Sequence, residues 1–287
     1  MELILGTANF GTVYGVANNQ EKMTRRRCHE VLDFAYSSGV GCLDTAKNYG
    51  DSESIIGEFH RAGRTYKVFS KVSDFNTINV DDLVTQARLT IQRLQIEKLS
   101  GFYFHNSRIL HDFPPSQINA AIKHLVDSGF ADKVGVSVYD EAELIWVAKT
   151  FPRIQLFQVP ENVLDRRLLD SKLVRELYES GCEFHVRSIF LQGLLLMEPG
   201  AIPTHLQKAA PAIESLQIFS KNQGMSVLQV CLSYLSLINW ASSFVIGVTN
   251  VEQLKSILLS KSTVLNRANL PPQLSDFILD PRNWALK

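Results

Sequence analysis

Four side chains have residue types and spacing that suit the transfer of a proton to a carbonyl oxygen. They are Asp44, Tyr49, Lys71 and His105, and all but the tyrosine directly end a short apolar segment. A carbonyl group that accepts a hydride becomes an alkoxide and needs a proton. A tyrosine gives up its proton more easily beside a lysine ammonium, because the positive charge favours the phenolate. We therefore predict that Tyr49 donates the proton and that Lys71 assists it.

The two other side chains have supporting roles in this hypothesis. Asp44 would pair with Lys71 and keep the ammonium group charged and oriented, and His105 would donate a hydrogen bond to the substrate oxygen. Each of these residue types alone is more often structural, as a rim charge, a helix cap or a buried histidine. Four complementary groups at successive segment ends favour the catalytic interpretation, whereas the remaining histidines receive a structural one.

Apolar, strand-like segments alternate with helical periodicity along most of the chain. We expect strands at residues 3–7, 40–44, 67–71, 99–104, 134–137, 154–158, 184–188 and 244–247. Parallel strands need crossover connections, so eight such units fit a closed (β/α)8 TIM barrel of the α/β class, in which functional groups collect at the carboxyl ends of the strands. Neighbouring strands lie about 5 Å apart, so the four side chains are expected to converge. An open doubly wound sheet is the alternative, but residues 6–11 lack the G-x-G-x-x-G spacing.

Helical stripes follow most of the expected strands. Thr24 is the expected N-cap of the first long helix. Apolar residues at three- and four-residue spacing predict the buried faces, and these include Val31, Leu32, Ala35, Ile118, Ala121, Ile122, Leu125, Val126, Val251, Leu254 and Leu258. We expect one domain over residues 1–287, with residues 266–287 as a C-terminal tail over the barrel.

Composition excludes several classes of function. The chain has 287 residues, of which 45% are apolar and 20% charged, and its 29 basic residues balance 29 acidic ones. This balance offers no electrostatic case for binding nucleic acid or an anionic membrane, and the basic run Arg25–Arg27 is interpreted as a solvated helix face. No apolar run is long enough to span a bilayer and no signal-peptide pattern is present, so we expect a cytoplasmic protein. The scattered cysteines predict structural thiols and no metal site.

Three motifs resemble those of a known family. Residues 43–53 read Leu-Asp-Thr-Ala-x-x-Tyr-Gly-x-x-Glu, which resembles the most specific motif of the aldo-keto reductases, and Phe69-Ser70-Lys71 and Phe104-His105 match the other two catalytic blocks. The chain is similar to bacterial-type members of this family from Leu3 to about Ile257. The resemblance implies the tetrad named above, a small-molecule aldehyde or ketone as substrate, and an oxidoreductase that uses NADPH by family default, with NADH as the alternative.

The resemblance also implies a set of cofactor contacts across the barrel mouth. Val138 replaces an asparagine that commonly contacts the carboxamide, and Arg187 stands where many members place a tyrosine stacked on the nicotinamide. A guanidinium can also stack on a flat ring. Gly247 and Gln253 occupy the places of the lysine and arginine that bind the 2′-phosphate in the best-known reductases. The implied contacts are Gly6, Thr7, Ala8, Asp44, Ser137, Gln158, Arg187, Ser188, Phe190, Gln192, Gly193, Gly247, Thr249 and Gln253.

The sequence gives weaker indications about the substrate. Loop residues Phe10, Tyr14, those at 106–115 and Trp284 are candidate pocket walls or packing residues. Residues 162–167 resemble stretches in bacterial members encoded with sugar-modifying pathways, which favours a polar, sugar-like carbonyl compound. Two alternatives stay open: a cofactor-binding regulatory or redox-sensing subunit with little turnover, and a Schiff-base aldolase that uses Lys71 as nucleophile. We disfavour the aldolase because an adjacent Asp44 would raise the pKa of that lysine.

Overall fold

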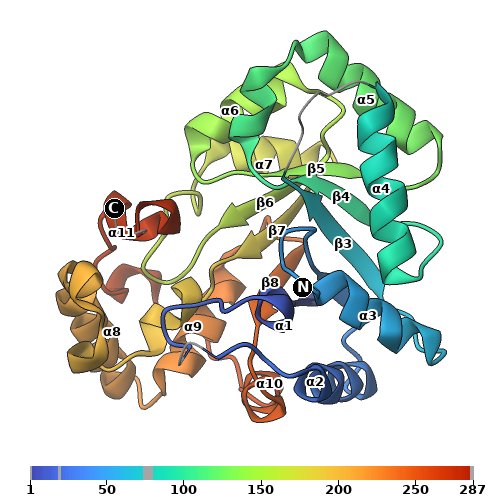
Figure 1. The fold of residues 1–287 in the computed structure, drawn as a ribbon. Coiled ribbons are helices and arrows are strands. Elements are labelled where there is room, and N and C mark those ends of the chain that lie inside the picture. The colour runs from blue at the N-terminus through green and yellow to red at the C-terminus, as the bar shows by residue number, and fades with distance from the viewer. Residues whose placement is uncertain (1, 19–20, 74–79, 285–287) are drawn as a thin grey trace.

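The computed structural model describes residues 2–18, 21–73 and 80–284, with the side chain of residue 80 left out. Eight parallel strands, each beside the next in sequence, close into a barrel (Figure 1). This confirms the predicted (β/α)8 barrel, and every expected strand overlaps an observed one. The strands are β1 (Glu2–Gly6), β2 (Cys42–Asp44), β3 (Lys67–Val72), β4 (Gly101–Phe104), β5 (Val134–Ser137), β6 (Leu156–Pro160), β7 (Glu183–Arg187) and β8 (Ser243–Gly247).

Helices cover the outside of the barrel. The Thr24 side chain accepts a hydrogen bond from the Arg27 N–H and caps the first long helix, as predicted. The helices are α1 (Ala8–Gly11), α2 (Arg25–Ser37), α3 (Ser52–Arg61), α4 (Val80–Leu94), α5 (Pro115–Asp127), α6 (Glu141–Thr150), α7 (Lys172–Glu179), α8 (Ala210–Asn222), α9 (Val227–Tyr234), α10 (Val251–Leu258) and α11 (Asp276–Leu279). Short 3₁₀ helices lie at Ser107–Asp112, Leu191–Leu196, Pro199–Ala201, Thr204–Ala209, Leu235–Leu237, Arg267–Asn269 and Pro281–Asn283.

The predicted buried faces are correct along most of their length and wrong at two ends. Val31, Leu32 and Ala35 of α2 are fully buried, as are Ile118, Ala121 and Leu125 of α5. Val126 is 40% exposed and Leu258 is 37% exposed. Both lie in the last turn of their helix, on its solvent side. The apolar spacing therefore predicts burial correctly in the middle of these helices but not in their last turn. Helices α7, α8 and α9 were not predicted.

Two layers of apolar side chains form the core. The larger layer lies between the strands and the surrounding helices, and a smaller cluster of Ile4, Cys42, Phe69, Tyr103 and Leu156 fills the barrel itself. The barrel is therefore a packed structure and not a pore. His185 lies in the same interior, where its Nδ1 is 2.8 Å from the Tyr103 hydroxyl.

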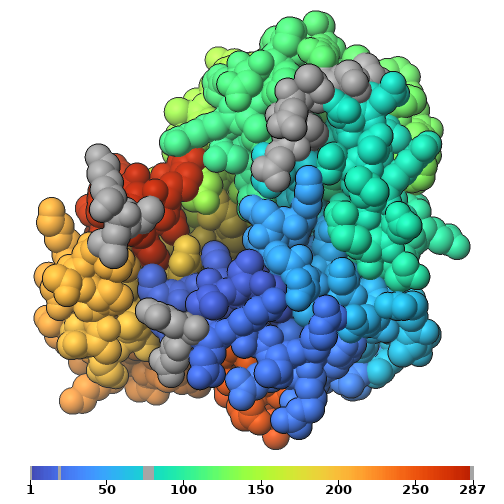
Figure 2. All heavy atoms as spheres, in the orientation of Figure 1, coloured from blue at the N-terminus to red at the C-terminus, as the bar shows by residue number. Residues whose placement is uncertain are grey.

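The C-terminal segment is bonded to the start of helix α6 and to the loop after β6. The Leu274 N–H donates to the Leu164 carbonyl at 3.0 Å, and Arg282 forms an ion pair with Glu143 at 3.0 Å. The space-filling view shows this segment, in red, against the orange α8 region (Figure 2). Among the residues that the structure describes, no helix combines the length and the apolar character needed to cross a membrane.

Candidate active site

Strand alternation explains why the predicted site residues come together. Successive side chains of a strand point to opposite faces, so a residue two positions after an inward-facing one also faces inward. Asp44 follows Cys42 at this spacing, and Gln158 follows Leu156. The same spacing relates Phe69 to Lys71, Tyr103 to His105, and His185 to Arg187. The site residues therefore form a polar layer at the carboxyl ends of their strands, next to the apolar cluster that fills the barrel.

A buried ion pair lies at the centre of this layer. Lys71 Nζ is 2.5 Å from Asp44 Oδ1 and 3.0 Å from the Thr45 carbonyl oxygen, and Gln158 Nε2 donates to Asp44 Oδ2 at 2.8 Å. The Lys71 side chain is 1% exposed. Burial lowers the pKa of Lys71, and the Asp44 carboxylate offsets only part of that shift. Asp44 raises this pKa, as expected, but desolvation outweighs the attraction, so the net shift of the Lys71 pKa is downward.

Tyr49 lies above this pair in the loop between β2 and α3. Lys71 Nζ is 5.3 Å from the centre of the Tyr49 ring, and the ring meets the His105 imidazole edge-on, with centroids 5.7 Å apart. Burial and the Asp44 carboxylate raise the pKa of Tyr49, whereas the Arg187 cation lowers it. The cation that opposes the rise in this pKa is thus Arg187, whereas the sequence pointed to Lys71. A phenol with a raised pKa is protonated at neutral pH and holds the proton that a reduction needs.

Two glycines fix the position of the Tyr49 loop. A Cβ atom on Gly11 would lie 1.7 Å from the Tyr49 carbonyl oxygen, so only glycine permits the close contact between α1 and this loop. Gly50 has a φ of +54° and packs against the Gly11 backbone. The Tyr49 N–H also donates to the Ala46 carbonyl at 3.0 Å. The tyrosine is therefore held by its backbone rather than by its hydroxyl.

His105 follows β4 and is held neutral. Burial, and then the Lys71 and Arg187 cations, lower the pKa of His105 to about 3. Its Nδ1 atom is buried and has no hydrogen-bond partner among the described residues. An unpartnered buried nitrogen is costly unless a ligand or water satisfies it. His105 thus has a free ring nitrogen beside Tyr49 while it carries no charge near pH 7.

The last residues of the motif at 43–53, Ser52 and Glu53, form hydrogen bonds that connect the segments around the site. Ser52 Oγ donates to Thr7 Oγ1 at 2.8 Å and lies 3.0 Å from Thr45 Oγ1, and these hydroxyl groups join the segment after β1 to the segment after β2 and to the start of α3. Glu53 is buried, where it accepts from Ser70 Oγ at 2.6 Å and pairs with Arg93 Nε at 2.6 Å. The motif therefore combines two site residues, Asp44 and Tyr49, with structural ones.

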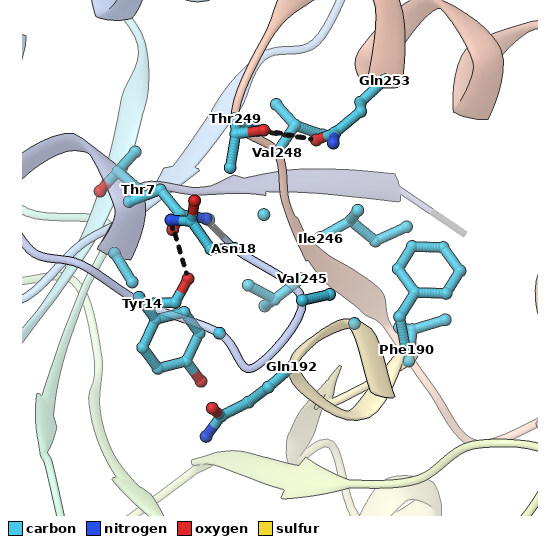
Figure 3. Close-up of a pocket in the computed structure, with 18 of the residues that line it drawn as sticks. Thr7, Tyr14, Asn18, Phe190, Gln192, Val245, Ile246, Val248, Thr249 and Gln253 are labelled. Atoms are coloured by element: carbon cyan, nitrogen blue, oxygen red, sulfur yellow. Dashed lines mark hydrogen bonds between the residues drawn. The ribbon is translucent and has the colours of Figure 1, made fainter. Parts of the chain in front are cut away.

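An elongated cavity of about 830 Å³ begins at Asp44 and Tyr49 and runs along the barrel mouth to α10. Figure 3 shows its wall built from three segments: Thr7 to Asn18, Phe190 and Gln192, and Val245 to Gln253. Every residue predicted to contact the cofactor lines this cavity except Ser137. Ser137 is buried beside it, where its Oγ accepts from Arg187 Nε at 3.4 Å. At the far end, Thr249 and Gln253 are hydrogen-bonded to each other (Figure 3).

The loop after β7 has an unusual backbone where it lines the cavity. Ser188, Leu191 and Gln192 have φ values of 63°, 46° and 57°, and they are three of the four non-glycine residues with positive φ among the described residues. Such conformations cost free energy and cluster at ligand sites. The loop also touches the segment after β1: a Cβ on Gly15 would lie 3.1 Å from the Gln192 carbonyl oxygen, and one on Gly193 would lie 2.6 Å from Ala17 Cβ.

The comparisons with known proteins agree with this geometry. The sequence model described as the Aldo/keto reductase family matches residues 2–270. The chain belongs to the aldo-keto reductase family. Its fold is similar to the crystal structure of the thermostable aldo-keto reductase Tm1743 in complex with the inhibitor epalrestat, with a TM-score of 0.69 over 93% of this chain and 92% of that one, at 22% identity. Among curated proteins, none matches this sequence.

Aldo-keto reductases in general reduce carbonyl compounds with NADPH or NADH, and the cavity is compatible with such a cofactor. It is long, it begins at the groups that would meet a reacting carbonyl, and it carries two cations, Arg187 near its inner end and Arg27 beside α10. The loop after β7 lines this cavity, and the unpartnered His105 nitrogen lies behind Tyr49 at its inner end, although His105 itself is not a lining residue. Within the described residues, no group of three or more His, Cys, Asp or Glu side chains is arranged to hold a metal ion.

The sequence pattern missed some residues of this reductase and misassigned others. The arginines at 25–27 are exposed, as expected for a solvated helix face, but Arg27 also lines the cavity. Figure 1 shows the reason, because α2 lies beside α10, and no local signal reports that packing. Of the candidate walls, Tyr14 lines the cavity, whereas Phe10 is fully buried in the core and the Trp284 indole donates to the Ile278 carbonyl. Those two residues are packing residues.

Proposed function

We propose that this aldo-keto reductase uses NADPH, or alternatively NADH, to reduce an aldehyde or ketone to the alcohol, with Tyr49 as the proton donor. The observation that carries this proposal is the contact between the Tyr49 ring, the buried Lys71–Asp44 pair and His105 at one end of an elongated cavity. These groups supply a proton, a nearby positive charge and a free hydrogen-bonding nitrogen at the same place.

The residues have distinct roles in the proposed reaction. When bound, the cofactor supplies a hydride to the carbonyl carbon. Tyr49 gives its hydroxyl proton to the carbonyl oxygen, and the positive charges of Lys71 and Arg187 stabilise the negative charge that remains on the tyrosine. Asp44 and Gln158 hold Lys71 in place, and neutral His105 orients the substrate oxygen.

The residues proposed to hold the cofactor are those that line the cavity beyond Tyr49. Gly6, Thr7 and Arg187 would hold the nicotinamide, the loop of Ser188 to Gly193 the pyrophosphate, and Gly247 to Gln253 the adenosine end. A polar, sugar-like carbonyl compound is the substrate class that we would test first. Residues 162–167, which gave that indication, do not line the cavity; Asn162 instead donates to the Ser188 carbonyl at 3.1 Å.

The structure also bears on the two alternatives. A Schiff-base mechanism needs a lysine that a carbonyl compound can reach, and Lys71 lies beneath Tyr49 with its amine already bonded to Asp44 and Thr45. This disfavours the aldolase, although its lowered pKa would suit one. A regulatory or redox-sensing subunit would bind the cofactor without appreciable turnover, and only a kinetic measurement separates it from the enzyme.

The test has two parts. Titration of the purified protein with NADPH and with NADH should show binding of at least one, and a panel of polar aldehydes and ketones should show cofactor oxidation. Tyr49→Phe should lower kcat by about 100- to 10,000-fold and leave the cofactor Kd unchanged, because it removes the proton without removing a cofactor contact. Tyr178→Phe, on the exposed side of α7, is the matched control. Equal turnover of Tyr49→Phe and the unaltered protein would exclude Tyr49 as the acid, and cofactor binding without turnover would favour the regulatory alternative.

A further inference from the structure

Arg187 is a cation without a matching anion. Its guanidinium donates to Ser137 Oγ at 3.4 Å, to Ser188 Oγ at 3.1 Å and to the Val138 carbonyl at 3.2 Å, and none of these acceptors is charged. Within the described part of the chain, it forms no ion pair. Lys71 is neutralised by Asp44, and His105 is neutral, so Arg187 leaves the inner end of the cavity with a net positive charge.

The Arg187 guanidinium is fixed in position at the cavity wall by its hydrogen bonds and by Tyr139. Tyr139 stacks against it, with the ring centre 4.1 Å from the guanidinium carbon. Because Arg187 lines the cavity and Tyr139 does not, the tyrosine supports the guanidinium from behind. Three hydrogen bonds and one stacking contact leave the group little freedom to move away from a ligand. Its charge is therefore preorganised, and it acts on the Tyr49 phenol.

A second arginine, Arg282, also contacts Tyr139, but it is paired with carboxylates. Arg282 lies 3.7 Å from the centre of the Tyr139 ring, but its charge is balanced by Asp280 at 2.7 Å and Glu143 at 3.0 Å. Arg282 thus contributes packing without net charge, and it does not line the cavity. The two arginines form a natural pair for comparison, since both contact Tyr139 and only one is unpaired.

We propose that Arg187 makes the cavity discriminate between the two redox states of a nicotinamide cofactor by charge. This inference rests on the proposed function. The reduced nicotinamide ring is neutral and the oxidised ring carries a positive charge, so a fixed, unpaired cation beside the ring disfavours the oxidised form. The oxidised cofactor is then bound more weakly than the reduced one, and the protein selects the reduced form from a mixed pool. Tighter binding of the reduced form also makes the bound couple more oxidising, by about 30 mV for each tenfold ratio of the two Kd values.

The experiment measures the Kd of NADPH and of NADP⁺ by calorimetry, for the unaltered protein and for three variants. The unaltered protein should bind NADPH more tightly than NADP⁺. Arg187→Gln, which removes the charge, should reduce the ratio of the two Kd values by at least tenfold, which is the effect of a unit charge about 12 Å away at an effective dielectric constant of about 20 and a lower bound for a charge closer to the ring. Arg187→Lys keeps the charge and should retain most of the ratio. Arg282→Gln removes the balanced charge and should leave it within about twofold.

Each outcome bears on a different claim. An unchanged ratio in Arg187→Gln, with both cofactors still bound, overturns the inference and leaves the proposed function standing. An equal fall in Arg187→Gln and Arg282→Gln also overturns it, because packing of the stack would then explain the effect. If the unaltered protein binds neither NADPH nor NADP⁺, nor NADH in its place, the proposed function fails together with the inference.

Discussion

Lys71 and Asp44 form an ion pair between neighbouring strands, with Nζ 2.5 Å from Oδ1 and both side chains almost fully buried. We predict that Lys71→Met destabilises the protein by about 3–5 kcal/mol, because it leaves a carboxylate buried without its cation. The double variant Asp44→Asn with Lys71→Met removes both charges and should regain a large part of that stability. Urea unfolding of the single and double variants measures the difference. Additive losses in the double variant would contradict this account of the pair.

A single methyl group on Gly11 should disturb catalysis more than binding. The new Cβ would meet the Tyr49 carbonyl oxygen at 1.7 Å and the Asp51 nitrogen at 2.6 Å, so the loop carrying Tyr49 has to move. A displacement near 1 Å can cost about 100-fold in rate. We expect Gly11→Ala to lower kcat at least tenfold while the Kd of NADPH changes little. Gly200→Ala is the control, since nothing lies within 4 Å of its added Cβ. Normal kcat in Gly11→Ala would show that the contact does not fix Tyr49.

Arg27 should favour NADPH over NADH. It lines the outer part of the cavity with Glu252, Gln253 and Ser256, and it has no ion-pair partner among the described residues. A charged hydrogen bond to a phosphate contributes about 1.5–3 kcal/mol, and 1.4 kcal/mol corresponds to a tenfold change in affinity. Arg27→Gln should therefore weaken NADPH binding by about tenfold and leave NADH binding within twofold.

The neighbouring arginine provides the comparison for this prediction. Arg26 is exposed on the same helix and pairs with Glu30 at 3.3 Å, outside the cavity. Arg26→Gln should change neither Kd. Parallel losses of NADPH and NADH affinity in Arg27→Gln would mean that the side chain does not distinguish the 2′-phosphate.

His185 should make the fold sensitive to acid. Burial, and then the Lys71 and Lys133 cations, lower its pKa to about 3, whereas an unfolded histidine titrates near 6.5. Between these values the unfolded chain binds more protons, so stability falls as the pH falls. The loss from this one group should be about 2 kcal/mol at pH 5 relative to pH 7.

The difference between two pH values isolates this effect from the general cost of a substitution. His185→Gln can still bond to the Tyr103 hydroxyl, and it should reduce the loss of unfolding free energy between pH 7 and pH 5 by about 2 kcal/mol. His205→Gln, at an exposed position, is the control for removing an imidazole. The same pH dependence in His185→Gln and the unaltered protein would exclude His185 as the source.

The sequence predicts most of the inner site because its geometry follows from strand alternation. Asp44, Lys71 and Gln158 each end an apolar segment, and a closed parallel barrel brings such ends to one mouth. The family motif adds Tyr49, which lies in a loop that no periodicity describes. Sequence also accounts for Thr24 as a helix cap, since that interaction spans only three residues.

The remaining features depend on contacts between distant parts of the chain. The position of Arg27 is set by the packing of α2 on α10, and the stack at Tyr139 joins residues 187 and 282. The net direction of the Lys71 pKa could not be predicted either, because it depends on how completely the lysine is buried as well as on its partner. The exposure of Val126 and Leu258 could not be predicted for the same reason. The spacing of apolar residues does not show where the end of a helix extends beyond the elements it packs against.

The contact between the loops after β1 and β7 has a kinetic consequence. Gly15 meets the Gln192 backbone and Ala17 meets Gly193 where both loops line the cavity. An elongated ligand bound along that cavity passes these touching loops, and we expect the loops to separate when it enters and again when it leaves. The rate constants for association and dissociation then depend on how quickly the loops part, and loop opening can limit the steady-state rate even when chemistry is fast. In that regime the first turnover appears as a burst, and substitutions at Gly15 or Gly193 alter the slow phase that follows it.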